Sequence, residues 1–283
     1  MMEFAKIGPE SYAAILTAAI LAFVVPIAII VIWLVKKKER IVSVLVGAAT
    51  FIIFAMLLEK PIQNLLLVPT QMGLKETGLS AFVGARPFLL ALLLGLFPGI
   101  FEETGRFVAF KTVLRKYKNR ETSVSYGLGH GFIEVIILVG FSYITYVSYA
   151  EMINNGTFGS VVELVRAQSP EQVGQLTLLA EQLTAIRFTD ILLVFMERSF
   201  SVLFHMGCSI LVFYSARDAK RIWLYPLAVL LHSLMDFVAV LYSFGLLSIP
   251  VWGLELFIAA FGIAAFLCGY CLLYRKDKAA SVQ

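Results

Sequence analysis

The residues best suited to chemistry are the chain's three histidines, and each shares a helix face with an acidic residue. The pairs are His130 with Glu134, His205 with Glu197, and His232 with Asp236. Two glutamates also precede an arginine in Glu102-Glu103-Thr-Gly-Arg106. Imidazole nitrogens and carboxylate oxygens are the usual ligands of a catalytic zinc ion, which keeps one position open for water. These residue types therefore predict hydrolysis by an activated water molecule.

In the zinc form of this hypothesis, the metal ligands are His130, His205, His232 and Glu103. The neighbouring carboxylate of the glutamate pair, Glu102, is the general base, and the two glutamates can exchange these roles. Glu134 and Asp236 are expected to accept the second N–H of a ligating histidine, and Arg106 to neutralise a glutamate. A metal-free form stays open, in which a glutamate and a histidine activate water together and a second histidine stabilises the oxyanion.

The composition indicates that these residues lie in a membrane. Of the 283 residues, 60% are hydrophobic and 15% are charged, whereas soluble domains carry about 25% charged residues. A hydrocarbon core of about 30 Å is crossed by roughly 20 helical residues, and seven segments meet that requirement. They are 11–35, 41–67, 87–110, 122–150, 190–214, 222–245 and 250–274. The prediction is an all-α polytopic integral membrane protein, a bundle of transmembrane helices that forms a single membrane domain over 1–283.

Lysine and arginine concentrate on one side of these spans, which predicts that this side is cytoplasmic. They are Lys36, Lys37, Lys38, Arg40, Lys111, Arg115, Lys116, Lys118, Arg120, Arg217, Lys220, Arg221, Arg275, Lys276 and Lys278. The other side has fewer, namely Lys6, Lys60, Lys75, Arg86, Arg166 and Arg187. The amino terminus is therefore expected outside and the carboxyl terminus in the cytoplasm. This bias accounts for the net charge of +4 and suits an anionic leaflet, so no nucleic-acid partner is expected.

A count along the spans places the candidate residues at one depth. At about 1.5 Å per residue from the inner end of each span, Glu103 lies roughly 10 Å deep, His130 roughly 12 Å, His205 roughly 14 Å and His232 roughly 15 Å. Ionisable groups at membrane depth are costly and are functional candidates by default. Four of them in one layer predict a cluster in the cytosolic half of the bilayer.

The one long connection between spans is 151–189, which the orientation places on the extracytoplasmic side. It contains the turn signal Asn154-Asn-Gly, followed by apolar residues spaced among Glu and Gln. A pair of short amphipathic helices is expected there, serving either as a gate or as a connector.

Taken in order, these motifs resemble the YhfC family of intramembrane metalloproteases, which is distantly related to the type II CAAX prenyl endopeptidases and to PrsW. The resemblance covers about residues 40 to 245 and rests on the glutamate pair with Arg106, Gly129-His130-Gly, Glu197-Arg198 with His205, and His232 with Asp236. It implies that Glu103 or Glu102 works with the later histidines to activate water. In the CAAX group the last histidine is paired with asparagine, whereas here its partner is Asp236, so prenyl-protein specificity is not carried over.

The predicted function is therefore an intramembrane endopeptidase, dependent on zinc, that cleaves a membrane-embedded or membrane-associated peptide or protein. The predicted location is a bacterial cytoplasmic membrane. Two alternatives stay open. Buried acids and histidines also form ion sites and proton relays, which would make the chain an ion- or proton-coupled transporter or channel. A non-catalytic immunity or scaffold protein would use the same bundle only to bind a partner.

Overall fold

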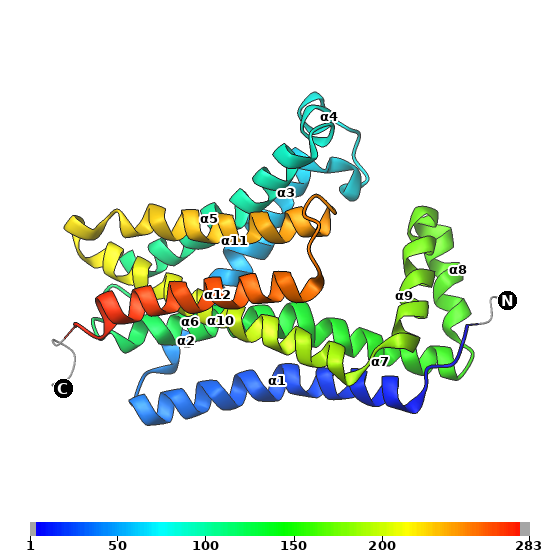
Figure 1. Ribbon diagram of the computed structural model, residues 1–283, viewed down its shortest axis with the longest axis horizontal. Coiled ribbons are helices and arrows are strands. Elements are labelled where there is room, and N and C mark those ends of the chain that lie inside the picture. The colour runs from blue at the N-terminus through cyan, green and yellow to red at the C-terminus, as the bar shows by residue number, and fades with distance from the viewer. Residues whose placement is uncertain (1–3, 278–283) are drawn as a thin grey trace. The chain divides into compact units, whose positions relative to one another are not determined.

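The computed structural model describes residues 4–277, and every regular element among them is a helix (Figure 1). Lys278, one of the basic residues named above, lies outside the described residues. In chain order the elements are α1 (Pro9–Lys37), α2 (Ile41–Thr50), η1 (Phe51–Glu59), α3 (Lys60–Leu67), η2 (Pro69–Met72), α4 (Gly78–Gly84), α5 (Pro87–Lys111), α6 (Glu121–Glu134), η3 (Val135–Gly140), α7 (Phe141–Asn154), α8 (Phe158–Gln168), η4 (Pro170–Gln172), α9 (Val173–Ala185), α10 (Phe188–Arg217), η5 (Ala219–Arg221), α11 (Leu224–Ser243), α12 (Val251–Gly269) and η6 (Tyr270–Tyr274).

Seven helical stretches of the described chain are long and apolar enough to cross a membrane. They are Pro9–Lys37, Ile41–Leu67, Pro87–Lys111, Glu121–Asn154, Phe188–Arg217, Ala219–Ser243 and Val251–Tyr274. The predicted all-α multi-pass class is confirmed, and each of the seven predicted segments coincides with one of these stretches. The orientation of the termini stays a prediction.

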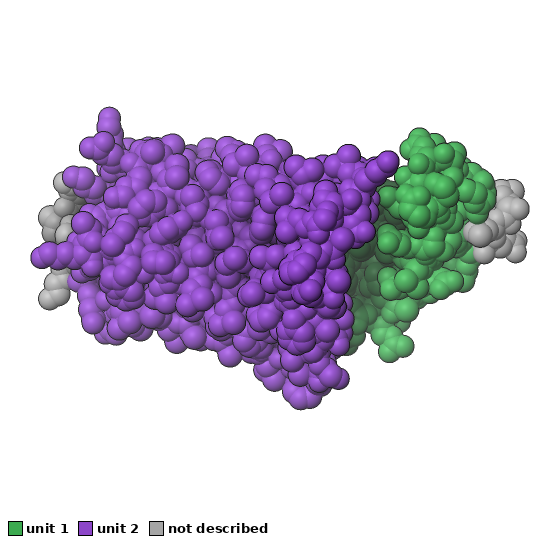
Figure 2. Space-filling view, turned by 90° about the horizontal axis from the view of Figure 1, so that it is seen from above, with its two compact units in different colours: residues 1–29, 134–196 green, residues 30–133, 197–283 purple. Residues whose placement is uncertain are grey.

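The described residues divide into two compact units, coloured separately in Figure 2. Unit 1 is formed by 1–29 and 134–196, and unit 2 by 30–133 and 197–283. In unit 1, α8 and α9 lie side by side within the predicted 151–189 connection (Figure 1). The Ser11 hydroxyl donates to the Thr184 carbonyl at 3.0 Å, which ties α1 to the end of α9. That 1–283 forms one domain, and that 151–189 is extracytoplasmic, both stay predictions.

In unit 2, α5 and α11 pack with their backbones in close approach, because glycines replace side chains at the contact. A Cβ atom added at Gly95 would lie 2.5 Å from the backbone nitrogen of Phe237, and one added at Gly99 would lie 2.7 Å from the Val229 carbonyl oxygen. Both distances are too short for a real side chain. The two glycines therefore let α5 and α11 lie directly against each other.

Glycines also line two faces of α6, the helix that carries His130. A Cβ at Gly127 would lie 2.7 Å from the Cα of Met206 on α10, and a Cβ at Gly129 would overlap the Val44 carbonyl on α2. Both neighbours thus approach the α6 backbone closely, and His130 itself is fully buried.

A proline in the middle of α5 leaves one backbone carbonyl without its helical donor, and a side chain of α3 replaces that donor. Pro98 has no N–H, so the carbonyl of Leu94, four residues earlier, loses its helical donor. The side-chain amide of Gln63, which is 4% exposed, donates to that carbonyl at 3.1 Å. This bond replaces the missing one where lipid offers no alternative donor, and it fixes α3 against α5.

The glycine contacts can be tested with one substitution at a crowded and one at an open position. Gly99→Ala should lower the free energy of unfolding by about 1–3 kcal/mol, because the added methyl must push α5 away from α11. Gly84→Ala is the control, since nothing lies within 4 Å of a Cβ there. Thermal melting of both variants in detergent checks this, and equal melting temperatures would contradict it.

Candidate active site

Three charged residues of α5, in unit 2, are buried. Glu102 is 6% exposed, and Glu103 and Arg106 are each 0% exposed. Consecutive residues of a helix point about 100° apart, so the two glutamates face different neighbours. Each one meets a different histidine.

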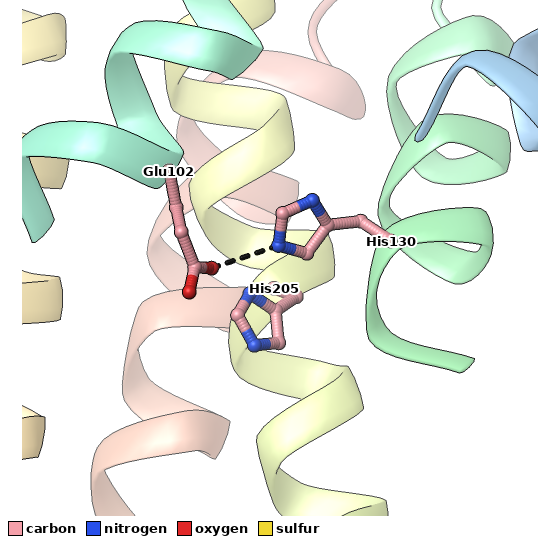
Figure 3. A group of neighbouring side chains, drawn as sticks. All are labelled: Glu102, His130 and His205. Atoms are coloured by element: carbon pink, nitrogen blue, oxygen red, sulfur yellow. Dashed lines mark hydrogen bonds and ion pairs between the residues drawn. The ribbon is translucent and has the colours of Figure 1, made fainter. Parts of the chain in front are cut away.

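Glu102 faces α6 and α10. Its Oε2 is 2.8 Å from His130 Nε2, and Figure 3 shows the carboxylate directed at that ring with His205 beside it. The His130 and His205 ring centroids are 4.8 Å apart. One ligand atom from each of Glu102, His130 and His205 lies within 4.8 Å of the others, so this buried group could hold a metal ion.

Glu103 faces α11 instead. His232 Nδ1 lies 2.8 Å from Glu103 Oε1, and Arg106 Nη1 lies 3.3 Å from the same oxygen. An ionised carboxylate only accepts hydrogen bonds, so His232 donates from Nδ1. The other ring nitrogen, Nε2, is 3.8 Å from Glu102 Oε2 and 3.5 Å from Asp236 Oδ2. His232 is thereby oriented by one glutamate and faces the other.

Arg106 links this pair to α10. Its Nη1 donates to the His205 carbonyl at 3.2 Å, and its Nη2 is 3.2 Å from His205 Nδ1. A guanidinium has no acceptor, so Nδ1 accepts and the His205 proton is on Nε2. A metal ion held by His205 would have to take one of these two ring nitrogens, and at Nδ1 it would replace the Arg106 contact. The Tyr126 ring on α6 packs beneath the guanidinium, 5.9 Å from its Cζ.

The donor set fits a metal ion. Zinc bonds of about 2.0–2.2 Å in tetrahedral geometry separate the ligand atoms by about 3.3–3.6 Å. The present ligand atoms lie within 4.8 Å of one another, with one pair at 2.8 Å, so small side-chain adjustments would reach that spacing. Two buried atoms near the cluster also lack a hydrogen-bond partner among the described residues, His130 Nδ1 and Glu103 Oε2. Buried polar atoms without partners are uncommon and often mark a site for an ion or water.

The structure thus brings together most of the predicted site residues. Glu102, Glu103, Arg106, His130, His205, His232 and Asp236 all belong to unit 2 and lie in this network. The group with metal-ligand spacing contains Glu102, whereas Glu103 is bonded to His232 and Arg106. Glu134 ends α6 and belongs to unit 1, so its role beside His130 stays a prediction. Glu197 forms an ion pair with the adjacent Arg198.

Sequence reasoning did not select Glu59 as a site residue. It ends the π-helical segment η1, is 1% exposed, and has two side-chain oxygens with no hydrogen-bond donor among the described residues. Lys60 Nζ lies 3.4 Å from its Oε1. The sequence signal that could have identified Glu59 was an acid inside the predicted span 41–67. The structure adds a second sign, because π-helical turns often occur at functional sites.

Fold and site together define a multi-pass membrane protein with a buried glutamate and histidine cluster able to bind a metal. The chain belongs to the family described as YhfC intramembrane metalloprotease, whose model matches residues 21–258. It is 29% identical over 245 residues to the "Uncharacterized membrane protein YhfC" of Bacillus subtilis (strain 168), which covers 85% of this chain and 88% of that protein. No solved structure matches the chain.

The Arg106 network can be tested through stability. Arg106→Met should lower the free energy of unfolding by about 3–5 kcal/mol, because the Glu103 charge is left buried without its partner. The double variant Glu103→Gln/Arg106→Met should recover part of that loss. Denaturant titration in detergent gives both values.

A matched control is the exposed pair Arg166 and Glu163 in unit 1, whose side chains are 44% and 66% exposed. Arg166→Met should change stability by less than about 1 kcal/mol. A similar loss in both arginine variants would show that the buried pair has no special role.

Proposed function

We propose that this protein is an intramembrane metallopeptidase that hydrolyses a peptide bond in or next to the bilayer. The observation that carries the proposal is the buried group of Glu102, His130 and His205, with His232 adjoining it at membrane depth. Membership in a family described as an intramembrane metalloprotease supports it. Buried ionisable side chains are costly in a membrane protein, so these four are functional candidates by default.

The residues that would hold the metal are Glu102, His130 and His205, and zinc suits their mixture of nitrogen and oxygen donors. When bound, zinc lowers the pKa of a water ligand and polarises the substrate carbonyl. This assignment differs from the sequence hypothesis, which had Glu103 and His232 among the ligands. The geometry favours Glu102, because its oxygen lies beside His130 while Glu103 is engaged by His232 and Arg106.

His232 then serves as the proton carrier. In its neutral form, with the proton on Nδ1 held by Glu103, the ring can accept a proton at Nε2 from the attacking water and return it to the leaving nitrogen. Asp236 and Glu102 near that nitrogen stabilise the imidazolium formed in between. Arg106 holds Glu103 in register for this task.

The substrate we propose is a membrane-embedded or membrane-associated peptide segment, because the cluster lies in helices that can cross a membrane. The setting is a bacterial cytoplasmic membrane, with the amino terminus outside and the carboxyl terminus in the cytoplasm. The distribution of lysine and arginine supports that orientation.

Metal content separates the roles of the histidines. Wild-type protein, washed with a mild chelator in detergent, should retain about one zinc ion per chain. His130→Ala and His205→Ala should lose it, while His232→Ala should keep it because His232 is not a ligand in this assignment. Elemental mass spectrometry of the folded variants gives the answer.

Retention of zinc in all three variants would show that the metal does not bind at this cluster. Loss in His232→Ala as well would return that residue to the ligand set that the sequence suggested. A metal-free wild type in well-folded form would overturn the metal-dependent mechanism.

Turnover tests the peptidase itself. Reconstituted protein is mixed with a library of fluorescently labelled single-span peptides, and cleavage products are identified by mass spectrometry. Glu103→Gln and His232→Ala should reduce cleavage by about 10²- to 10⁴-fold, the usual contribution of a general base and its support. Glu181→Gln, an exposed acid on α9, is the control and should cleave like wild type.

Cleavage that persists in Glu103→Gln and His232→Ala would end the assignment. Ion flux into protein-containing vesicles, measured on the same preparation without any cleavage, would favour the transporter alternative instead.

A further inference from the structure

Unit 2 also has a concave site whose lining residues are not those of the glutamate and histidine cluster. A pocket of about 660 Å³ in unit 2 is lined by Phe110, Lys111, Arg115, Lys118, Ala216 and Arg217. It sits where α5 ends at Lys111 and α10 ends at Arg217, and Arg115 and Lys118 of the segment after α5 also line it. Its volume falls within the range of about 300–1,000 Å³ that is common for ligand sites.

The described residues that line the pocket carry mainly positive charge. Four of its six lining residues are basic and none is acidic. The side chains of Lys111, Arg115 and Lys118 form no ion pair among the described residues. The nearest acids along the chain are engaged elsewhere, Asp218 with Arg221 at 3.3 Å and Glu121 with Arg120 at 3.3 Å. Like charges around one concave space repel each other, so an anion bound among them would be stabilised.

Arg217 is held in place at the wall of this pocket. Its Nη2 donates to the Tyr117 carbonyl, and its guanidinium stacks on the Phe213 ring with Cζ 3.6 Å from the ring centroid. Its Nε is buried and has no hydrogen-bond partner among the described residues. A guanidinium fixed in this way is already ordered before a ligand arrives, which reduces the entropy cost of binding.

We infer that this pocket binds a phosphate-bearing anion. Arginine offers paired donors to phosphate oxygens, and lysine adds point charges. Phe110 and Ala216 supply an apolar wall beside the charges, which suits a ligand whose phosphate adjoins a less polar part. The inference concerns a separate site from the proposed peptidase centre and does not depend on it.

Two sources share this chemistry. The pocket lies at the ends of two stretches long enough to span a membrane, which is where a lipid headgroup would be. A soluble diphosphate group would meet the same basic residues. Both bind through phosphate oxygens, and the experiment distinguishes them.

The test uses full-length protein in detergent with three probes: phosphatidylglycerol in mixed micelles, phosphatidylcholine in the same micelles, and pyrophosphate. Native mass spectrometry counts bound lipid, and thermal melting reports pyrophosphate. The pocket variant is Arg115→Gln/Lys118→Gln, whose residues are exposed and form no ion pair among the described residues. The control is Arg275→Gln/Lys276→Gln, which removes the same charge from residues that do not line the pocket.

The expected result is binding of phosphatidylglycerol, of pyrophosphate, or of both, weakened about tenfold or more in the pocket variant because two charge-assisted hydrogen bonds are lost. The control variant should bind like wild type. Binding of the lipid alone identifies a headgroup site, and binding of pyrophosphate alone identifies a soluble ligand. Equal weakening in both variants, equal retention of phosphatidylcholine, or no binding of either anionic probe would overturn the inference.

Discussion

The fold of unit 2 depends on one constraint, that a charge buried among apolar helices must find its partner inside the protein. Arg106 is 0% exposed and lies against Glu103 on its own helix and His205 on α10. Glu103 in turn binds His232 on α11. The charges therefore link α5, α10 and α11 through direct contacts. Since an unpaired charge is far more costly at low dielectric than in water, this network specifies how these helices face one another.

Close packing makes such contacts possible. Side chains reach across helices to within hydrogen-bond distance only if the backbones approach closely, and glycines at 95, 99, 127 and 129 allow that approach on α5 and α6. Gln63 also holds α3 against α5, because it donates to the Leu94 carbonyl that Pro98 leaves without a helical donor. Lipid offers no donor for that carbonyl. The residues that bring these helices together thus also allow the side chains of the candidate site to reach one another.

The two adjacent glutamates have different contacts because of helix geometry. One residue along α5 turns a side chain by about 100°, so Glu102 and Glu103 reach different helices. Glu102 lies with His130, and Glu103 lies with His232 and Arg106. Both glutamates nevertheless belong to one buried cluster. His232 Nε2 is the atom that joins them, because it faces the Glu102 carboxylate.

Hydropathy and spacing in the sequence determined the class of protein, because a span must satisfy its own backbone as a helix and must be apolar along about 20 residues. The seven predicted segments correspond to the seven stretches of the structure for that reason. The candidate residues were also accessible from sequence, since ionisable groups are rare within spans and so stand out. The tertiary structure alone decided which glutamate meets which histidine, that Arg106 holds His205, and that Glu59 is buried. Depth along a helix can be counted from the chain, but rotation about the helix axis is set by packing against neighbours, and packing joins residues far apart in sequence.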